Sequence, residues 1–216
     1  MKSTILSSVI AASILVVSCG KDKPLTSESK EVTTTKEGKL YTIDSLNSKI
    51  EWKGYKVVKS ENTSHIGTIN FESGDVTVKD GKLESGKFVA DMNSLQSIDL
   101  KDDPDSKGKL EGHLKNADFF EVEKFPTASY EITKVSDSEG GDYNTILDGN
   151  LTIKGITKPV KFNANVSVEN GLVSISTEPT DINREDFGVK FAIPVQNGVL
   201  KNEVTLQISV KAMENK

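Results

Sequence analysis

The sequence predicts an all-β domain of about eight antiparallel strands. Apolar and polar residues alternate along many short runs, which is the pattern of strands with one buried and one solvated face. Gly, Asn and Asp residues stand between these runs, as they do in tight hairpin turns. About eight such runs fit either a β-sandwich or an up-and-down barrel, and the pattern alone leaves both open.

The alternation extends from about Lys39 to Met213. The clearest runs keep their apolar residues on one parity: Ile50 and Trp52; Ile69 and Phe71; Val76 and Val78; Phe88, Ala90 and Met92; Val160, Phe162, Ala164, Val166 and Val168; Val204, Leu206, Ile208 and Val210. The turn signals between runs are Ser73-Gly74-Asp75, Lys79-Asp80-Gly81-Lys82, Ser138 to Asp142, Glu169-Asn170-Gly171 and Gln196-Asn197-Gly198. Several contain Asp-Gly or Asn-Gly, which favour the positive φ angles of two-residue hairpins.

Composition limits the size of the fold and the kinds of partner. With 216 residues and 35% hydrophobic content, the chain can bury one core, and nothing indicates a second. The formal net charge of -5 argues against a nucleic-acid partner, whose phosphates would have to be neutralised by Lys and Arg.

The first eighteen residues have the pattern of a secretory signal. Lys2 precedes an apolar run from Ile5 to Val17, which is too short and too rich in serine for a comfortable membrane span. The run leads into Val16-Val17-Ser18-Cys19-Gly20, which resembles a bacterial lipobox and contains the single cysteine of the chain. We therefore expect Cys19 to be lipidated, and the protein to be anchored in a membrane of the bacterial cell envelope, facing the periplasm or the cell surface. An incidental cysteine is the alternative.

Residues 20–38 are rich in Ser, Thr, Lys and Glu and poor in apolar residues, as flexible tethers are. We divide the chain accordingly into a signal peptide (1–18), a lipidated cysteine with a flexible tether (19–38) and one β domain (39–216). Because no cysteine remains for a disulfide, the β domain must depend on packing for its stability.

The segment from Gly112 to Pro126 holds three of the eight Phe residues and one of the two His residues. Phe119 and Phe120 are adjacent, so a regular strand would leave one of the two rings exposed. We expect instead a short helical segment near residues 106–120, which ends near Phe119. An extended piece should follow at Phe125-Pro126, because the residue before a proline disfavours helical geometry.

The sequence has no motif of the common catalytic sites: no nucleophile elbow, no glycine-rich dinucleotide or phosphate loop and no His-Glu-x-x-His. Neither His65 nor His113 stands near a signature serine, and two histidines are too few for a zinc site without cysteine. The acidic run Asp102 to Asp105 has partial EF-hand spacing, but the last ligand position falls on Leu114, which favours a solvated loop. We expect neither an enzyme nor a metal site.

Arg184 is the only arginine in the chain, where all other basic residues except histidine are lysines. Its planar guanidinium binds a carboxylate, a phosphate or a set of backbone carbonyls at two points. Two roles stay open: Arg184 holds one end of the β domain together, on Asp186 or a distant carboxylate, or it contacts the headgroup of a ligand.

From residue 39 onward the sequence resembles the YceI-like family. The motifs that carry the resemblance occur in the family's order: Tyr41-Thr42-Ile43-Asp44, Gly67 to Phe71, HLKNADFFEVEKFPTASYEI from His113, Gly149 to Val160, and NREDFGV from Asn183. Members are lipocalin-like barrels of eight antiparallel strands exported to the periplasm or cell envelope, and some hold a polyisoprenoid chain inside the barrel. The resemblance therefore implies a binding protein and not an enzyme.

Such a ligand implies an apolar lining. The candidates are large apolar side chains, mostly of the buried strand parity: Trp52, Ile69, Phe71, Phe88, Met92, Phe119, Phe120, Tyr130, Phe162, Phe187 and Phe191. Plain core packing is the alternative for each. Of Phe119 and Phe120, one should face the barrel and the other should lie under the loop. His113 either hydrogen-bonds a headgroup or stabilises a helix end.

Two functions remain open. The first is a membrane-anchored carrier or sequestering protein that holds an isoprenoid or similar amphiphile in an apolar cavity. The second is a structural or interaction lipoprotein whose barrel is filled by its own side chains and whose loops, such as Asp99 to Lys107, bind partners. No cofactor is implied beyond a bound lipid, and a monomer and a dimer both fit the sequence.

Overall fold

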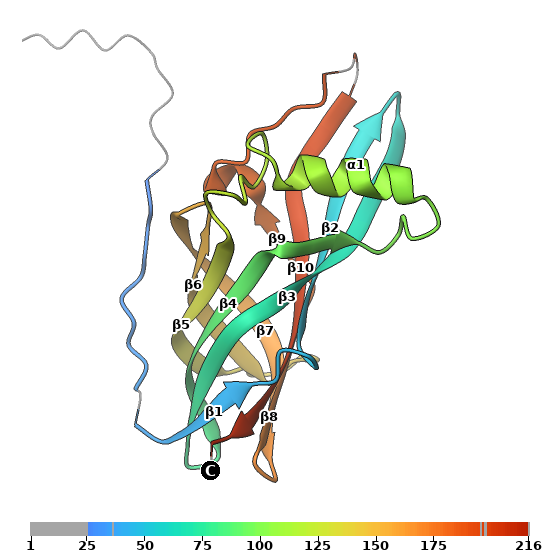
Figure 1. Ribbon diagram of the computed structural model, residues 1–216. Coiled ribbons are helices and arrows are strands. Elements are labelled where there is room, and N and C mark those ends of the chain that lie inside the picture. Colours follow the sequence, from blue (N-terminus) through green and yellow to red (C-terminus); the bar gives the residue numbers. More distant parts are fainter. Residues whose placement is uncertain (1–25, 36, 195, 197, 216) are drawn as a thin grey trace, which may run out of the picture.

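The structure is a computed structural model that describes residues 26–215 except 36, 195 and 197 (Figure 1). The predicted signal peptide and Cys19 lie outside the described residues. The elements in chain order are β1 (Lys39–Ile43), β2 (Lys49–Val58), β3 (Glu61–Lys79), β4 (Lys82–Ser97), α1 (Pro104–Lys115), β5 (Thr127–Asp137), β6 (Thr145–Ile153), β7 (Ile156–Glu169), β8 (Leu172–Thr177), β9 (Thr180–Asn183), the 3-10 turn η1 (Arg184–Phe187) and β10 (Gly198–Glu214).

Eight of the strands close into an antiparallel ring. Strands β2 to β8 pair in chain order, and β10 pairs with both β8 and β2, so that the sheet becomes a barrel. Two short strands stand outside the ring: β1 pairs with β10 and β3, and β9 pairs with β10. The predicted eight-stranded antiparallel barrel is therefore confirmed, and closure removes the free edges that an open sheet would expose.

The hairpin signals were mostly correct. Asp80 and Gly81 (φ 51° and 76°) join β3 to β4, and Asn170 and Gly171 (φ 52° and 76°) join β7 to β8. Ser73-Gly74-Asp75 is not a turn, because β3 continues through it with a bulge. Gly74 stands there for close packing, since a Cβ would lie 3.0 Å from the ring of Phe88.

Helix α1 starts earlier and ends earlier than predicted. Its first turn begins with Pro104, and the Asp103 side chain accepts a hydrogen bond from the backbone N–H of Ser106 at 3.1 Å. The helix ends before Asn116, and its last carbonyls accept hydrogen bonds from the backbone N–H groups of Phe120 and Val122. The expectation that it reaches Phe119 was therefore wrong. Among the described residues no helix is long and apolar enough to cross a membrane.

Helix α1 lies across one end of the barrel, which we call the α1 end (Figure 1). The Glu111 carboxylate accepts from the backbone N–H of Ser97 at 2.7 Å, and the Lys115 amine donates to the carbonyl of Asn93 at 2.7 Å. The loop after the helix is held by Lys154, in the hairpin between β6 and β7, which donates to the carbonyl of Phe119 at 2.7 Å. These three polar contacts hold α1 and the loop after it, which we call the cover, against the barrel.

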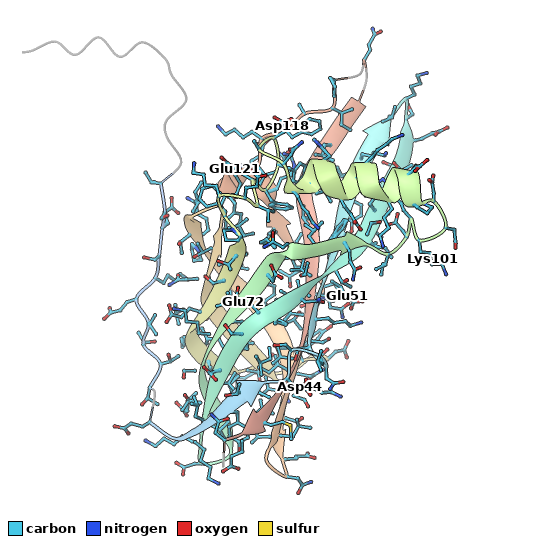
Figure 2. The ribbon with its side chains drawn as sticks, in the orientation of Figure 1. Asp44, Glu51, Glu72, Lys101, Asp118 and Glu121 are labelled. Carbon is cyan, nitrogen blue, oxygen red and sulfur yellow. The ribbon has the colours of Figure 1, made fainter. Side chains whose placement is uncertain are left out.

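The opposite end, which we call the filled end, is packed with the barrel's own side chains. The residues buried there are Tyr41, Val76, Val78, Leu83, Ile132, Ala164, Val173 and Ala212. Charged side chains such as Glu51 and Glu72 lie on the outside of the barrel (Figure 2). The outward parity of the strands is therefore solvated, as the alternation predicted.

Gly67 on β3 allows the closest packing in the barrel wall. A Cβ there would lie 1.9 Å from the carbonyl oxygen of Gln96 and 2.3 Å from Cζ2 of Trp52. We expect Gly67→Ala to lower the free energy of unfolding by about 1–3 kcal/mol, because a backbone atom and a buried ring must both move. Chemical denaturation measures this loss.

The matched control is Gly108→Ala on α1, where a Cβ would meet no atom within 4 Å. This variant should gain roughly 0.5–1 kcal/mol, because alanine favours the helix over glycine. Equal unfolding midpoints for the two variants would contradict the close packing at Gly67.

Candidate functional site

The half of the barrel nearer α1 encloses a cavity of about 150 Å³. Every strand of the ring contributes to its wall, and α1 and the loop after it cover it. The wall is almost entirely apolar. Apolar cavities of about this size stay free of water and accept apolar ligands.

Ten of the eleven predicted lining residues border this cavity. They are Trp52, Ile69, Phe71, Phe88, Met92, Phe119, Phe120, Tyr130, Phe162 and Phe187. The exception is Phe191, which lies after η1 and packs against the ring of His113 with centroids 4.4 Å apart. Strand parity places the strand residues correctly, but Phe191 is not in a strand, so parity gave no information about it.

The prediction selected large side chains and therefore missed many residues of the cavity wall. Smaller side chains border the cavity as well, among them Ile50, Leu95, Leu114, Leu147, Leu151, Ile175, Ile182, Val189, Leu206, Ile208 and Val210. Many of them share the parity of the predicted residues, which is the signal that could have found them. Gly54 on β2 also borders the cavity, and a Cβ there would meet no atom within 4 Å. The missing side chain at Gly54 thus leaves part of the space open.

Phe119 and Phe120 both border the cavity, although we expected one of them to lie away from the barrel. Their rings meet edge to face with centroids 5.0 Å apart. The turn that follows α1 brings both rings inward, because the backbone N–H of Phe120 bonds back to the carbonyl of Leu114 at 3.1 Å. Both rings therefore form part of the cover and close the cavity from the α1 end.

His113 does not border the cavity. Its ring lies between Phe119 and Phe191, with centroids 5.7 Å and 4.4 Å away. Its Nε2 atom is buried and has no hydrogen-bond partner among the described residues. The side chain is packed within the cover and does not face the space where a ligand would lie.

Arg184 is buried at the edge of the cavity wall, with 5% of its surface exposed. Its guanidinium donates to the carbonyls of Lys201, Val189 and Leu200 and to the side-chain oxygen of Asn202. The carboxylate within 4.0 Å belongs to Glu185 and not to Asp186, which we had named. Burial lowers the pKa of the guanidinium. Arg184 thus joins the start of β10 to the segment after η1.

Tyr130 turns only its ring toward the cavity. Its hydroxyl lies 2.9 Å from the carbonyl oxygen of Leu147 and 3.2 Å from that of Val160. Burial raises the pKa of this phenol, so it stays neutral at physiological pH. The ring meets Phe162 edge to face at 5.2 Å. The polar atom is therefore satisfied by the wall itself and is not presented to a ligand.

Trp52 is the single tryptophan of the chain and borders the cavity from β2. Its Nε1 atom is buried without a hydrogen-bond partner among the described residues. The indole packs over Gly67, whose missing side chain makes room for the ring. Because the ring touches the cavity, its fluorescence reports on what occupies that space.

A Ser-His-Asp set lies outside the cavity near the α1 end, but it is not arranged as a catalytic triad. Asp99 accepts from both the Ser97 hydroxyl at 2.7 Å and the His65 ring at 2.8 Å, so serine and histidine do not bond each other. Ser97 is fully buried. Burial raises the pKa of Asp99, but hydrogen bonds from Ser97, His65 and the Ile66 backbone outweigh it and hold the pKa below its usual value.

The part of the chain that the structure describes contains no group of three or more His, Cys, Asp or Glu side chains placed to bind a metal ion. Asp103, in the run with partial EF-hand spacing, instead caps helix α1.

Known proteins resemble this chain in sequence and in fold. A YceI-like domain matches residues 41–212. A UPF0312 protein of Shewanella baltica is 28% identical over 99% of both chains, and one of Pseudomonas putida is 29% identical over 78% of this chain and 86% of its own.

Two solved structures share the fold. BcnA of Burkholderia cenocepacia has a TM-score of 0.61 and 20% identity, over 79% of this chain and 99% of its own. A polyisoprenoid binding domain of Saccharophagus degradans, implicated in plant cell wall breakdown, has a TM-score of 0.53 and 11% identity, over 81% of this chain and 98% of its own. Because the family match spans most of the sequence and nearly all of the barrel, the chain belongs to the YceI-like family.

Proposed function

We propose that this protein holds an isoprenoid or a similar amphiphile in the barrel cavity, as a carrier or sequestering protein. The observation that carries the proposal is the cavity beneath α1, whose wall is almost entirely apolar. Each CH₂ group that a ligand buries there contributes about 0.8 kcal/mol, so the part of an isoprenoid tail that enters the cavity needs no polar contact to bind. A cavity of about 150 Å³ takes a ligand of about the size of benzene, so a longer tail must displace the covering Phe rings or place only its end in the cavity. The polyisoprenoid binding domain of Saccharophagus degradans has the same fold, which supports this class of ligand.

The polar groups near the cavity favour binding over catalysis. The Tyr130 hydroxyl and the Arg184 guanidinium are both occupied by groups of the barrel itself. Neither is free to transfer a proton or to stabilise a developing charge, which catalytic groups must do. The alternative of a structural lipoprotein requires a barrel filled throughout, and the cavity beneath α1 argues against it.

The proposal includes a membrane anchor at Cys19. The support for it is the signal-like segment 1–18 and the lipobox-like sequence that ends in Cys19-Gly20. Lipidation of a cysteine with several acyl chains gives stable attachment, because each chain adds its own burial free energy. The protein would then work at the surface of a membrane in the bacterial cell envelope.

Filling the cavity tests the ligand site. A Phe side chain at position 54 would occupy space that is open in the structure. We expect Gly54→Phe to weaken binding of geranylgeraniol at least about tenfold, because it excludes two or more CH₂ groups worth about 0.8 kcal/mol each. The fluorescence of Trp52 during titration with the prenol measures the affinity.

The same variant should not be less stable, since the added ring buries apolar surface worth roughly 1.5–3 kcal/mol in the empty protein. Gly108→Phe is the matched control, because it makes the same change on the exposed side of α1. An unchanged affinity in Gly54→Phe would show that the prenol does not bind in the barrel.

The role of Arg184 is tested by Arg184→Lys, which keeps the positive charge and removes the planar guanidinium with its several N–H donors. We expect the free energy of unfolding to fall by about 1–3 kcal/mol, because several buried carbonyls lose their donor. The affinity of the folded protein for geranylgeraniol should stay the same. A weaker affinity together with an unchanged melting temperature would instead identify Arg184 as a headgroup contact.

A further inference from the structure

The segment before the barrel points to an orientation on the membrane. We propose that residues 27–34, which we call the strap, hold the barrel with its α1 end toward the membrane that anchors Cys19. The cavity would then face the bilayer that supplies its ligand. This inference rests on the proposed function, both for the anchor and for the ligand. The surface that the α1 end would contact is a lipid bilayer.

The strap runs along the outside of β7, β6 and β5, although its composition predicts a flexible tether (Figure 1). Near its start, the N–H of Glu28 donates to the carbonyl of Thr157 at 2.7 Å, and the Ser27 hydroxyl accepts from the N–H of Thr157 at 3.1 Å. The Glu28 carboxylate also lies 3.1 Å from the amine of Lys158. These contacts fix the beginning of the strap to the first residues of β7.

The middle of the strap is held by one buried side chain. The Asn150 side chain accepts from the N–H of Lys30 at 2.9 Å and donates to its carbonyl at 2.8 Å. Further along, the N–H of Thr33 donates to the carbonyl of Thr133 at 3.0 Å. The hydroxyl groups of Thr33 and Thr34 also donate to the carbonyls of Thr133 and Ile132. The strap is therefore attached to three successive strands through both its backbone and its side chains.

The direction of the strap decides which end of the barrel is near the anchor. Thr157 follows the hairpin of β6 and β7, whose Lys154 bonds to the loop of the α1 end. After the strap the chain enters β1, and Lys39 pairs with Val78 next to the hairpin of β3 and β4. The strap thus begins at the α1 end and leads to the filled end, as Figure 1 shows. The lipidated cysteine precedes its beginning.

The length of chain between Cys19 and the strap limits how the barrel can be oriented relative to the membrane. Eight residues lead from Cys19 to Ser27, and they span at most about 28 Å when fully extended. Strand β7 runs from Thr157, at the strap's start, to Glu169 at the filled end, which is about 40 Å of strand and, at the usual tilt of barrel strands, about 30 Å along the barrel axis. A barrel with its filled end on the membrane would therefore need the whole linker fully extended, which the entropy of the chain disfavours.

Exposed apolar side chains do not decide the orientation, because they occur toward both ends. Ile66, Ile98 and Val199 are exposed toward the α1 end, and Leu40 and Met213 near the filled end. The asymmetry lies in the interior. The filled end is blocked by packed side chains, whereas the cavity lies directly beneath α1 and its loop. A lipid that leaves the bilayer would therefore reach the cavity through the end that the strap turns toward it.

Energy transfer from the protein to a membrane dye tests this orientation. The full-length acylated protein is placed in phosphatidylcholine vesicles that carry an acceptor dye on lipid headgroups. Lipidation consumes the thiol of Cys19, so a donor dye can be attached at Glu61→Cys or Glu169→Cys. Both glutamates are exposed in hairpins, the first at the α1 end and the second at the filled end. We expect clearly stronger transfer from position 61, and equal or stronger transfer from position 169 would overturn the proposal.

Strap variants identify the cause of the orientation. Glu28→Pro with Thr33→Pro removes two backbone donors of the strap together with the side-chain contacts of Glu28 and Thr33, and it leaves every barrel residue unchanged. The difference between the two donor positions should shrink. The control is Ser29→Pro with Glu31→Pro, whose N–H groups make no hydrogen bond among the described residues, and it should keep the difference. A difference that survives the first double variant would show that the strap does not set the orientation.

The prenol titration of the same proteins separates this inference from the proposed function. Geranylgeraniol binding with no difference in energy transfer would reject the orientation alone. A clear difference without prenol binding would support the orientation and reject the ligand. A protein that carries no acyl chain by mass spectrometry would reject the proposed anchor and, with it, the orientation that depends on the anchor.

Discussion

The pairing of β10 with both β2 and β8 is the constraint on which the rest of the structure depends. Once the ring is closed, every second residue of eight strands must face a common interior. At one end these residues pack together with Tyr41 of β1 and fill that interior. Toward the other end Gly54 contributes no side chain, and the space is left for the rings of the cover and for a cavity. A closed ring with one filled end is therefore also a container, whose other end is covered by α1 and the loop after it.

The wall of the container is almost entirely apolar, although polar residues take part in it. Tyr130 and Arg184 border the cavity, and each directs its polar atoms to carbonyls of the barrel. A buried donor that lacks a partner costs free energy, so these contacts stabilise the wall and also make it apolar. The same contacts that keep the fold stable thus leave a cavity that suits an apolar ligand.

Sequence reasoning predicted the features that depend on periodicity and missed those that depend on local backbone contacts. Alternation identified the strands and most of the aromatic wall, and the resemblance to the YceI-like family favoured a barrel over a sandwich. Alternation could not show that Gly74 lies within a continuous strand and not in a turn, because a glycine is compatible with both. The end of α1 and the position of Phe120 depend on backbone hydrogen bonds in the following turn, which no side-chain pattern reports. The strap was also missed, since it is attached through its backbone and through the same Ser, Thr and Glu side chains that are typical of a flexible tether.

The central claim is that the barrel holds a prenyl lipid, and native mass spectrometry of the protein purified from its own membranes tests it most directly. A barrel that holds such a lipid should give a mass above that of the acylated chain, and organic extraction should release an isoprenoid or similar amphiphile that accounts for the difference. A native mass equal to that of the acylated chain alone, with no lipid in the extract, would contradict it.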